Sequence, residues 1–164
     1  GFFEILKKMG ASIVWKNMRE ELGELVGDVN ITSNHLEGIN IDENMIPFII
    51  DEIPILAILA TQANSPTIIN GALELRVKES DRISAICYNL KSMGAEIIEK
   101  KDGFIINPSK KLNHSIIKTF NDHRIAMAFE IAGLMTSKKN ILDNKDCINI
   151  SFPEFFMLLN EILI

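Results

Sequence analysis

The sequence predicts a mixed α/β fold made of two tandem units of similar plan. The first observation is an internal repeat, in which LKKMGA starting at Leu6 recurs as LKSMGA starting at Leu90. Apolar residues at helical spacing precede each copy, and strand-like residues follow it. The repeat continues with two further helical patterns, which begin at Asp51 and Asp122 and are again followed by strand-like runs. Helices that alternate with strands in this way indicate the α/β class.

The repeated hexapeptide is predicted to end a helix in both copies. One face of each helix is apolar, and these faces consist of Phe2, Ile5, Leu6 and Met9 in one copy and Ile83, Ile86, Leu90 and Met93 in the other. Gly10 and Gly94 then suit the end of a helix, where a positive φ is often needed. Strands are expected to follow at residues 12–15 and 96–100.

The second pair of helices has little polar surface, so we expect both helices to be buried on nearly every side. Asp51 and Asp122 are placed to cap them, and strands are expected at 67–70 and 140–143. A hairpin turn is expected at Asp102–Gly103, and Pro153 is expected to open a last helix at 154–163. The chain therefore reads as part of one domain, with an incomplete first repeat unit at 1–78 and a second unit at 79–164.

Composition excludes several functional classes. A net charge of −5 gives no support to nucleic-acid binding, which leaves a basic footprint. The longest apolar run, residues 45–61, is interrupted by Asp51 and Glu52, which argues against a membrane span. Cys87 and Cys147 lack a metal-ligand spacing and indicate small buried thiols in a reducing compartment. We expect a soluble, cytoplasmic protein without a metal.

Polar residues gather at the start of three helices. At the first start, Asp51 and Glu52 are more simply explained as a cap and a first-turn carboxylate than as catalytic groups. At the second, residues 76–82 hold five charges in seven positions. A solvated face and an anion site fit that run equally well, since a helix start with Lys78 and Arg82 beside it favours anions.

The third helix start carries His123 and Arg124. A lone histidine is usually structural, as we expect for His35 and His114, but His123 adjoins both an arginine and a helix start. Cations at the positive end of a helix lower stability unless an anion occupies the position, which suggests a binding site. Taken together, the three polar helix starts predict a site that binds a small anionic molecule and contains acid-base groups. The chain has no P-loop, CxxC, GxSxG or HExxH motif, so nothing indicates a nucleotide, metal or flavin.

Four motifs carry a resemblance to a known family. They are residues 75–82 (LRVKESDR), 51–54 (DEIP), 121–127 (NDHRIAM) and 151–155 (SFPEF). Together and in this order they resemble the signatures of 5-enolpyruvylshikimate-3-phosphate synthases. The resemblance implies the enolpyruvyl transferase fold, with two similar domains of three βαβαββ units each, helices inside and sheets outside. This chain would supply about two of the six units. The N-terminal domain, which contributes much of the shikimate 3-phosphate site, would be missing.

The resemblance also implies a reaction, namely enolpyruvyl transfer from phosphoenolpyruvate to the 5-hydroxyl of shikimate 3-phosphate with release of phosphate and no cofactor. By motif position, Asp51 would act at the 5-hydroxyl and contact the substrate, and Glu79 would handle the methylene proton. Lys78 would share acid-base duty and contact both substrates. Arg82 and Arg124 would clamp phosphoenolpyruvate, and His123 would assist.

Two departures and two rival functions accompany this resemblance. Ile150 stands where some members carry a lysine, with Lys145 the nearest lysine, and Glu74 stands where some have asparagine. The first rival is the enolpyruvyl transferase that acts on UDP-N-acetylglucosamine, which the strings at residues 78–82 and 122–124 disfavour. The second is a non-catalytic anion-binding module of the same fold. We expect the chain alone to be inactive, because half an active site cannot close over its substrates.

Overall fold

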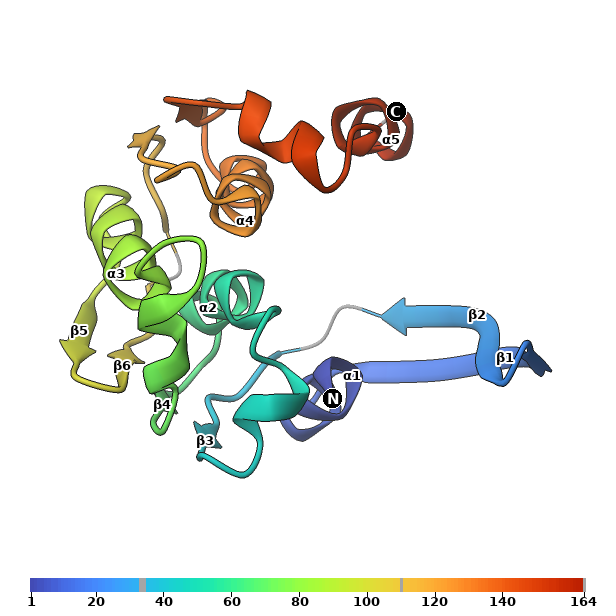
Figure 1. The fold of residues 1–164 in the computed structure, drawn as a ribbon. Helices are drawn as coiled ribbons and strands as arrows, with labels where there is room; N and C mark the ends of the chain where they lie inside the picture. Colours follow the sequence, from blue (N-terminus) through green and yellow to red (C-terminus); the bar gives the residue numbers. More distant parts are fainter. Residues whose placement is uncertain (33–34, 110, 164) are drawn as a thin grey trace.

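The computed structural model describes residues 1–32, 35–109 and 111–163. Figure 1 shows helices and strands alternating along the chain, which confirms the α/β class. The α-helices are α1 (Phe2–Lys8), α2 (Ile53–Thr61), α3 (Arg82–Ser92), α4 (His123–Gly133) and α5 (Phe155–Ile162). The strands are β1 (Ser12–Glu21), β2 (Glu24–Thr32), β3 (Asn40–Ile41), β4 (Thr67–Ile69), β5 (Ile97–Lys100), β6 (Gly103–Ile106), β7 (Ile116–Ile117) and β8 (Ile141–Leu142). Short 3-10 helices are η1 (Ile46–Phe48), η2 (Leu73–Val77) and η3 (Asp146–Ile150).

Four strands in the middle of the chain form one mixed sheet in the order β3–β4–β6–β5. Strands β3 and β4 are parallel and are connected through α2, whereas β6 runs antiparallel to both β4 and β5. Ile69 of β4 pairs with Ile41 on one side and with Phe104 on the other, and all three side chains are fully buried. The order β3–α2–β4–α3–β5–β6 is therefore one complete βαβαββ unit.

Partial units of the same plan flank this complete unit. Before it, α1 leads into the antiparallel β1–β2 hairpin, as α3 leads into β5–β6. After it, α4 connects the parallel strands β7 and β8, as α2 connects β3 and β4. The expected division between residues 78 and 79 does not follow the sheets, because β4 and its partner β6 lie on opposite sides of it. A repeating sequence does not itself show where each unit begins. Only the pairing of strands shows which residues share a sheet.

The two copies of the hexapeptide end α1 and α3 in the same way. Gly10 and Gly94 have φ values of 96° and 86°. The amide of the residue after each glycine donates to the carbonyl of the leucine five residues earlier, at 2.9 Å in both copies. This is the longer bond of a Schellman motif, which satisfies carbonyls left open at a helix end. The prediction of glycine-terminated helices is confirmed.

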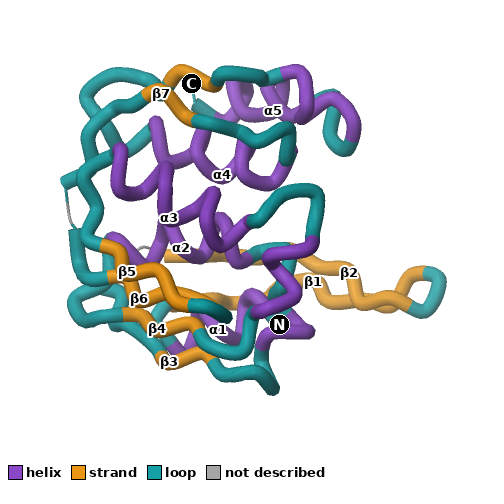
Figure 2. The backbone as a smooth tube through the Cα atoms, turned by 60° about the vertical axis from the view of Figure 1, so that its left-hand side comes forward, coloured by secondary structure: helices purple, strands orange, loops and turns teal. Residues whose placement is uncertain are grey.

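Helix α2 lies at the centre of the core. Seven of its nine residues are buried, and the hydroxyl of buried Thr61 donates to the carbonyl of Ile58 at 2.7 Å. Helices α3 and α4 both pack against α2. Figure 2 shows these helices between the four-stranded sheet on one side and β7 on the other, so helices lie inside and sheets outside, as expected. No helix within the described ranges has both the length and the apolar character needed to cross a membrane.

The helix starts differ in how they are capped. The side chain of Asp81 accepts from the amide of Ser84 at 3.0 Å to cap α3, and that of Asp122 accepts from the amide of Arg124 at 2.9 Å to cap α4. The expectation that Asp51 caps α2 is wrong. The N-cap is Glu52, whose backbone is already near-helical (φ −91°, ψ −5°), so the extended cap geometry does not form.

Several boundaries differ from the expected ones, and β4 and β8 are shorter than the strands expected at 67–70 and 140–143. The hairpin turn between β5 and β6 is made by residues 101–102, and Gly103 belongs to β6. Gly103 is needed for close strand approach instead, since an added Cβ would overlap the carbonyl oxygen of Ile69. Strand β1 continues beyond Trp15 to Glu21, and α5 begins two residues after Pro153.

Candidate functional site

Three buried helices begin at one place, and the guanidinium of Arg82 joins their starts. Arg82 is the first residue of α3, Asp51 immediately precedes the N-cap of α2, and Asp122 is the N-cap of α4. Arg82 donates from Nη1 to Asp51 at 2.9 Å and from Nε to Asp122 at 2.7 Å. The positive ends of three helix dipoles therefore meet here, which favours carboxylates and bound anions.

Arg82 and Asp122 form the inner part of this cluster. Their side chains are 1% and 0% exposed, and a second arginine nitrogen, Nη2, donates to Asp122 at 3.4 Å. Burial opposes both charges, but the mutual hydrogen bonds and attraction outweigh it. The pKa of Arg82 is consequently raised and the pKa of Asp122 lowered from their ordinary values. Both groups are therefore charged at neutral pH.

Asp51 and Glu79 form the outer part, which solvent reaches. Their side chains are 41% and 50% exposed, and Glu79 accepts from Nη2 of Arg82 at 2.6 Å. Arg124 holds Asp51 from the other side, with Nη2 at 3.2 Å from its carboxylate and Nη1 at 3.2 Å from its backbone carbonyl oxygen. Proton-accepting groups at the surface are thus positioned by cations held beneath and beside them.

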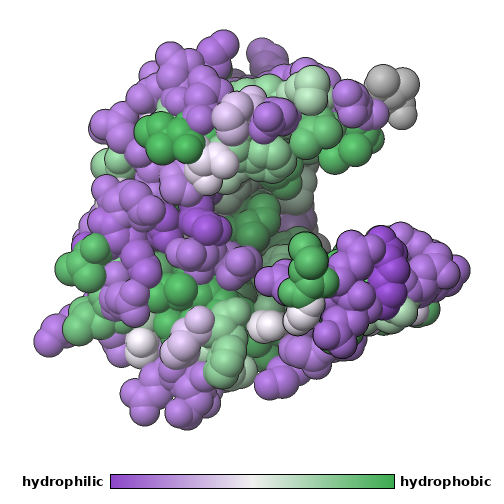
Figure 3. Space-filling model, turned by 45° about the vertical axis from the view of Figure 1, so that its right-hand side comes forward, coloured by the Kyte–Doolittle hydropathy of each residue, from purple (hydrophilic) through white to green (hydrophobic). Residues whose placement is uncertain are grey.

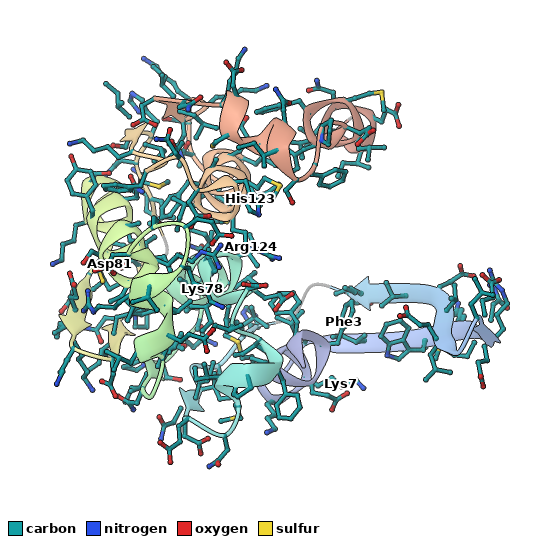
Figure 4. The ribbon with its side chains drawn as sticks, in the orientation of Figure 1. Phe3, Lys7, Lys78, Asp81, His123 and Arg124 are labelled. Atoms are coloured by element: carbon teal, nitrogen blue, oxygen red, sulfur yellow. The ribbon has the colours of Figure 1, made fainter. Side chains whose placement is uncertain are left out.

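Lys78 and His123 lie at the edges of the cluster. The ammonium of Lys78 contacts the carboxylate of Glu74 at 2.6 Å, and His123 is the half-buried first residue of α4. Figure 4 shows Lys78 near the start of α3 and His123 and Arg124 at the start of α4. The pairing of Glu74 with Lys78 was not predicted from the sequence. The four-residue spacing of the two residues, which is that of a helical ion pair, could have indicated it.

The charged run at residues 76–82 divides between two roles. Arg76 donates to Asp81 and to Glu99, each at 2.9 Å, and to the backbone carbonyl oxygens of Lys100 and Lys101 at 2.6 and 2.8 Å. The hydrogen bond to Asp81 is the main reason that the pKa of Arg76 is raised. Arg76 and Asp81 thus fasten the start of α3 to the β5–β6 hairpin. They contribute nothing to the cluster around Arg82.

A hollow of about 220 Å³ opens beside Asp51 and Arg124. Its wall is mostly apolar and comes from the first turns of α2 and from α4 and α5, through Pro54, Ile55, Met127, Ala128, Ile131 and Phe155. On a larger scale, Figure 3 shows the molecule hollowed between the β1–β2 hairpin and the C-terminal segment. The cluster therefore has polar groups at the mouth of an apolar recess.

Ile150, which stands where some family members are expected to carry a lysine, lies apart from the Arg82 cluster together with Lys145. Ile150 ends η3 with an exposed side chain, and Lys145 precedes η3. Lys145 lines a separate hollow together with Asp146, Asn149 and Phe156. Lys145 therefore does not reach the hollow beside Arg124 in this structure. In the ranges that the structure describes, no three His, Cys, Asp or Glu side chains are grouped so as to hold a metal ion.

Comparisons with known proteins identify a family for this chain. The family model described as EPSP synthase (3-phosphoshikimate 1-carboxyvinyltransferase) matches residues 2–159. This chain is 47% and 49% identical, over 99% of its length, to two proteins named 3-phosphoshikimate 1-carboxyvinyltransferase. They come from Sulfurihydrogenibium sp. (strain YO3AOP1) and Petrotoga mobilis, respectively. The chain spans about 38% of the length of each.

Solved structures give the same result. An EPSP synthase from Acinetobacter baumannii superposes with a TM-score of 0.91 at 40% identity, covering 97% of this chain and 38% of that one. The enolpyruvyl transferase NikO from Streptomyces tendae shares the fold, with a TM-score of 0.69 at 15% identity over 98% of this chain and 34% of that one. The four sequence motifs, the βαβαββ unit and these matches together show that the chain belongs to the EPSP synthase family.

Proposed function

We propose that the full-length protein transfers the enolpyruvyl group of phosphoenolpyruvate to the 5-hydroxyl of shikimate 3-phosphate and releases phosphate. The observation that carries this proposal is the cluster around Arg82, which joins the acid-base candidates and the cations of three motifs at three helix starts. The names of the relatives support the same reaction. Because this chain spans 38% of their length, the activity is proposed for the whole protein.

The chemistry needs two proton transfers. In the addition step a base removes the 5-hydroxyl proton while an acid protonates the methylene carbon, and the alkoxide oxygen bonds to C2 of phosphoenolpyruvate. In the elimination step a methyl proton leaves and the C2–O bond to phosphate breaks. Asp51 is assigned to the hydroxyl and Glu79 to the carbon, with Lys78 and His123 assisting. The solvent access of Asp51 and Glu79 supports these roles.

Binding of phosphoenolpyruvate requires an exchange of partners. The three carboxylates outnumber the two guanidiniums of the cluster, so it carries one negative charge in excess. An anion therefore has to replace Asp51 as the partner of Arg124. That exchange also frees Oδ2 of Asp51 to accept a proton, while Oδ1 stays bonded to Arg82. Arg82 stabilises the developing charge from beneath, in a cleft that water leaves on closure.

The second half of the cleft is assigned to the N-terminal domain, and this chain to the other domain. The broad hollow beside the β1–β2 hairpin offers room for such a partner. The isolated chain is then inactive, because it neither positions shikimate 3-phosphate nor excludes water. Two free and buried cysteines support a cytoplasmic location, where thiols stay reduced.

The test is phosphate release from phosphoenolpyruvate plus shikimate 3-phosphate by the full-length protein. Glu79→Gln should lower kcat by roughly 100-fold or more, as expected when a general acid-base group is removed. Glu4→Gln is the matched control, because Glu4 also pairs with a cation three residues later but lies in α1. An inactive wild-type protein would favour the non-catalytic anion-binding module instead, and turnover by the isolated chain would refute its predicted inactivity.

A further inference from the structure

Asp122 is a buried acid to which the proposed reaction assigns no role. Its side chain is fully buried. One oxygen, Oδ2, accepts from Nε of Arg82 at 2.7 Å and from the hydroxyl of Ser80 at 3.0 Å. The other, Oδ1, accepts from the amides of Arg124 and Ile125 at 2.9 and 3.4 Å and from Nη2 of Arg82 at 3.4 Å. With both oxygens occupied by protein donors, Asp122 has no lone pair left for a substrate.

These contacts lead to every part of the proposed site. Through Arg82, Asp122 supports the guanidinium that holds Asp51 and Glu79. Through the amide of Arg124 it fixes the first turn of α4, which carries His123 as well. Through the Ser80 hydroxyl it ties down the loop that carries Lys78 and Glu79.

We propose that Asp122 is a positioning residue for enolpyruvyl transfer, acting through Arg82, Arg124 and Ser80 and not by touching a substrate. The inference rests on the proposed function. Its physical basis is that Arg82 is shared among three carboxylates, of which only Asp122 is buried with it. The inner pair therefore sets the guanidinium orientation, and the two outer carboxylates follow it. A misplacement of about 1 Å in such a group costs roughly 100-fold in rate.

Asp81 provides a matched control within the same chain. It is also an aspartate that caps a helix and pairs with an arginine, with a 3.0 Å bond to the Ser84 amide and a 2.9 Å contact to Arg76. None of its partners belongs to the Arg82 cluster. Asp81→Asn and Asp122→Asn thus remove the same type of charge from the same kind of helix start.

The experiment compares full-length wild type, D122N and D81N by kcat, by KM for phosphoenolpyruvate and by thermal unfolding. Rates are expressed per folded molecule, from circular dichroism at the assay temperature. D122N keeps a capping oxygen but turns an amide group toward the donors of Arg82 and Ser80. We expect its kcat/KM to fall by roughly 100-fold, with kcat and KM both changed. D81N should lower the melting temperature and leave both constants per folded molecule unchanged.

Ser80→Ala keeps the test decisive if D122N does not fold. It removes one donor to Asp122 and should lower kcat/KM by roughly tenfold, the effect of about 1.4 kcal/mol. Loss that is explained by the folded fraction alone, at constant KM, would overturn the inference, as would equal behaviour of D122N and D81N or a silent S80A. An inactive wild type would instead overturn the proposed function, and this inference with it.

Discussion

Two arginines six residues apart in one motif organise different parts of the molecule. Arg76 bonds to Asp81, to Glu99 and to two carbonyls of the β5–β6 hairpin, and its side chain is 23% exposed. Arg82 bonds to Asp51, Glu79 and Asp122, and is 1% exposed. The first network is local to α3 and the β5–β6 hairpin, whereas the second connects three helix starts.

The difference shows what a run of charges in a sequence leaves undetermined. Arg76 precedes α3 and meets the hairpin that follows it, so these partners all lie between residues 81 and 101. Arg82 begins the helix and faces inward, where it meets residues 31 and 40 positions away. The direction of a side chain at a helix start therefore decides whether an arginine fastens a loop or builds a site. The following predictions test this contrast.

The largest effect is expected for Arg82→Met. It leaves Asp122 as a buried carboxylate without its cation, which costs about 3–5 kcal/mol. Denaturant unfolding of the full-length protein should show this loss, together with loss of turnover. Arg76→Met is the matched variant. Equal destabilisation by the two substitutions would remove the distinction between the networks.

A pH dependence follows from Asp122 and Asp81, whose pKa values are both lowered. In both, burial opposes ionisation, and hydrogen bonds, chiefly from Arg82 to Asp122 and from the Ser84 amide to Asp81, outweigh it. A carboxyl with a lowered folded pKa adds stability above its unfolded pKa of about 3.9, and this is lost as pH falls through the folded value. D122N should therefore lose less stability than wild type on acidification below about pH 4, as measured by unfolding at several pH values.

D81N should differ less from wild type than D122N does in the stability lost on acidification. The reason is that solvent reaches Asp81 and weakens its interaction with Arg76. Acid slopes of D81N and D122N that coincide would contradict the assignment of Asp122 as the buried partner.

Arg76→Met should have a moderate effect. Its ion pairs are partly exposed, so the main loss is its hydrogen bonds to the carbonyls of Lys100 and Lys101 in the hairpin, worth roughly 1–2 kcal/mol together. Hydrogen exchange of the β5 and β6 amides should rise, while kcat per folded molecule stays at the wild-type value. A fall in kcat would show that this network also reaches the site.

The smallest effect on stability is expected for Glu74→Ala. Its pair with Lys78 is largely exposed on the Glu74 side, and such pairs contribute about 0.5 kcal/mol or less. A drop in the unfolding free energy well above about 0.5 kcal/mol would refute this prediction. Glu74→Asn, which keeps a polar side chain without the charge, separates loss of the charge from loss of the side chain.

Local signals in the sequence were enough to predict much of the fold. The helix ends at Gly10 and Gly94 were predictable because a positive φ is a property of one residue and its neighbours. The cap by Asp122 was also predictable, because its side chain bonds only to amides two and three residues along the chain to form it. Failures came where distant contacts decide. Asp51 was expected to cap α2 because its position fits, but Arg82 and Arg124 compete for its carboxylate.

The sequence predicted which residues belong to the candidate site better than it predicted how they contact one another. The motifs brought Asp51, Arg82 and Arg124 into one hypothesis, and the structure places them in direct contact. The burial of Arg82 and the role of Asp122 as its partner were not predictable, because no sequence pattern states which carboxylate reaches a given guanidinium. Unit boundaries were missed for the same reason, since strand pairing is a tertiary property.

The meeting of three helix starts at Arg82 has a consequence for how the chain folds. The bonds that define the cluster connect residues separated by 31, 40 and 73 positions. Contacts of such sequence separation form only after long loops close, which makes them slow steps. A ribosome-bound chain that ends before α4 lacks Asp122 and leaves Arg82 without its inner partner. We therefore expect these helix starts to acquire their final order late, so that protection of the Arg124 amide, which donates to buried Asp122, would report completion of the native topology during refolding.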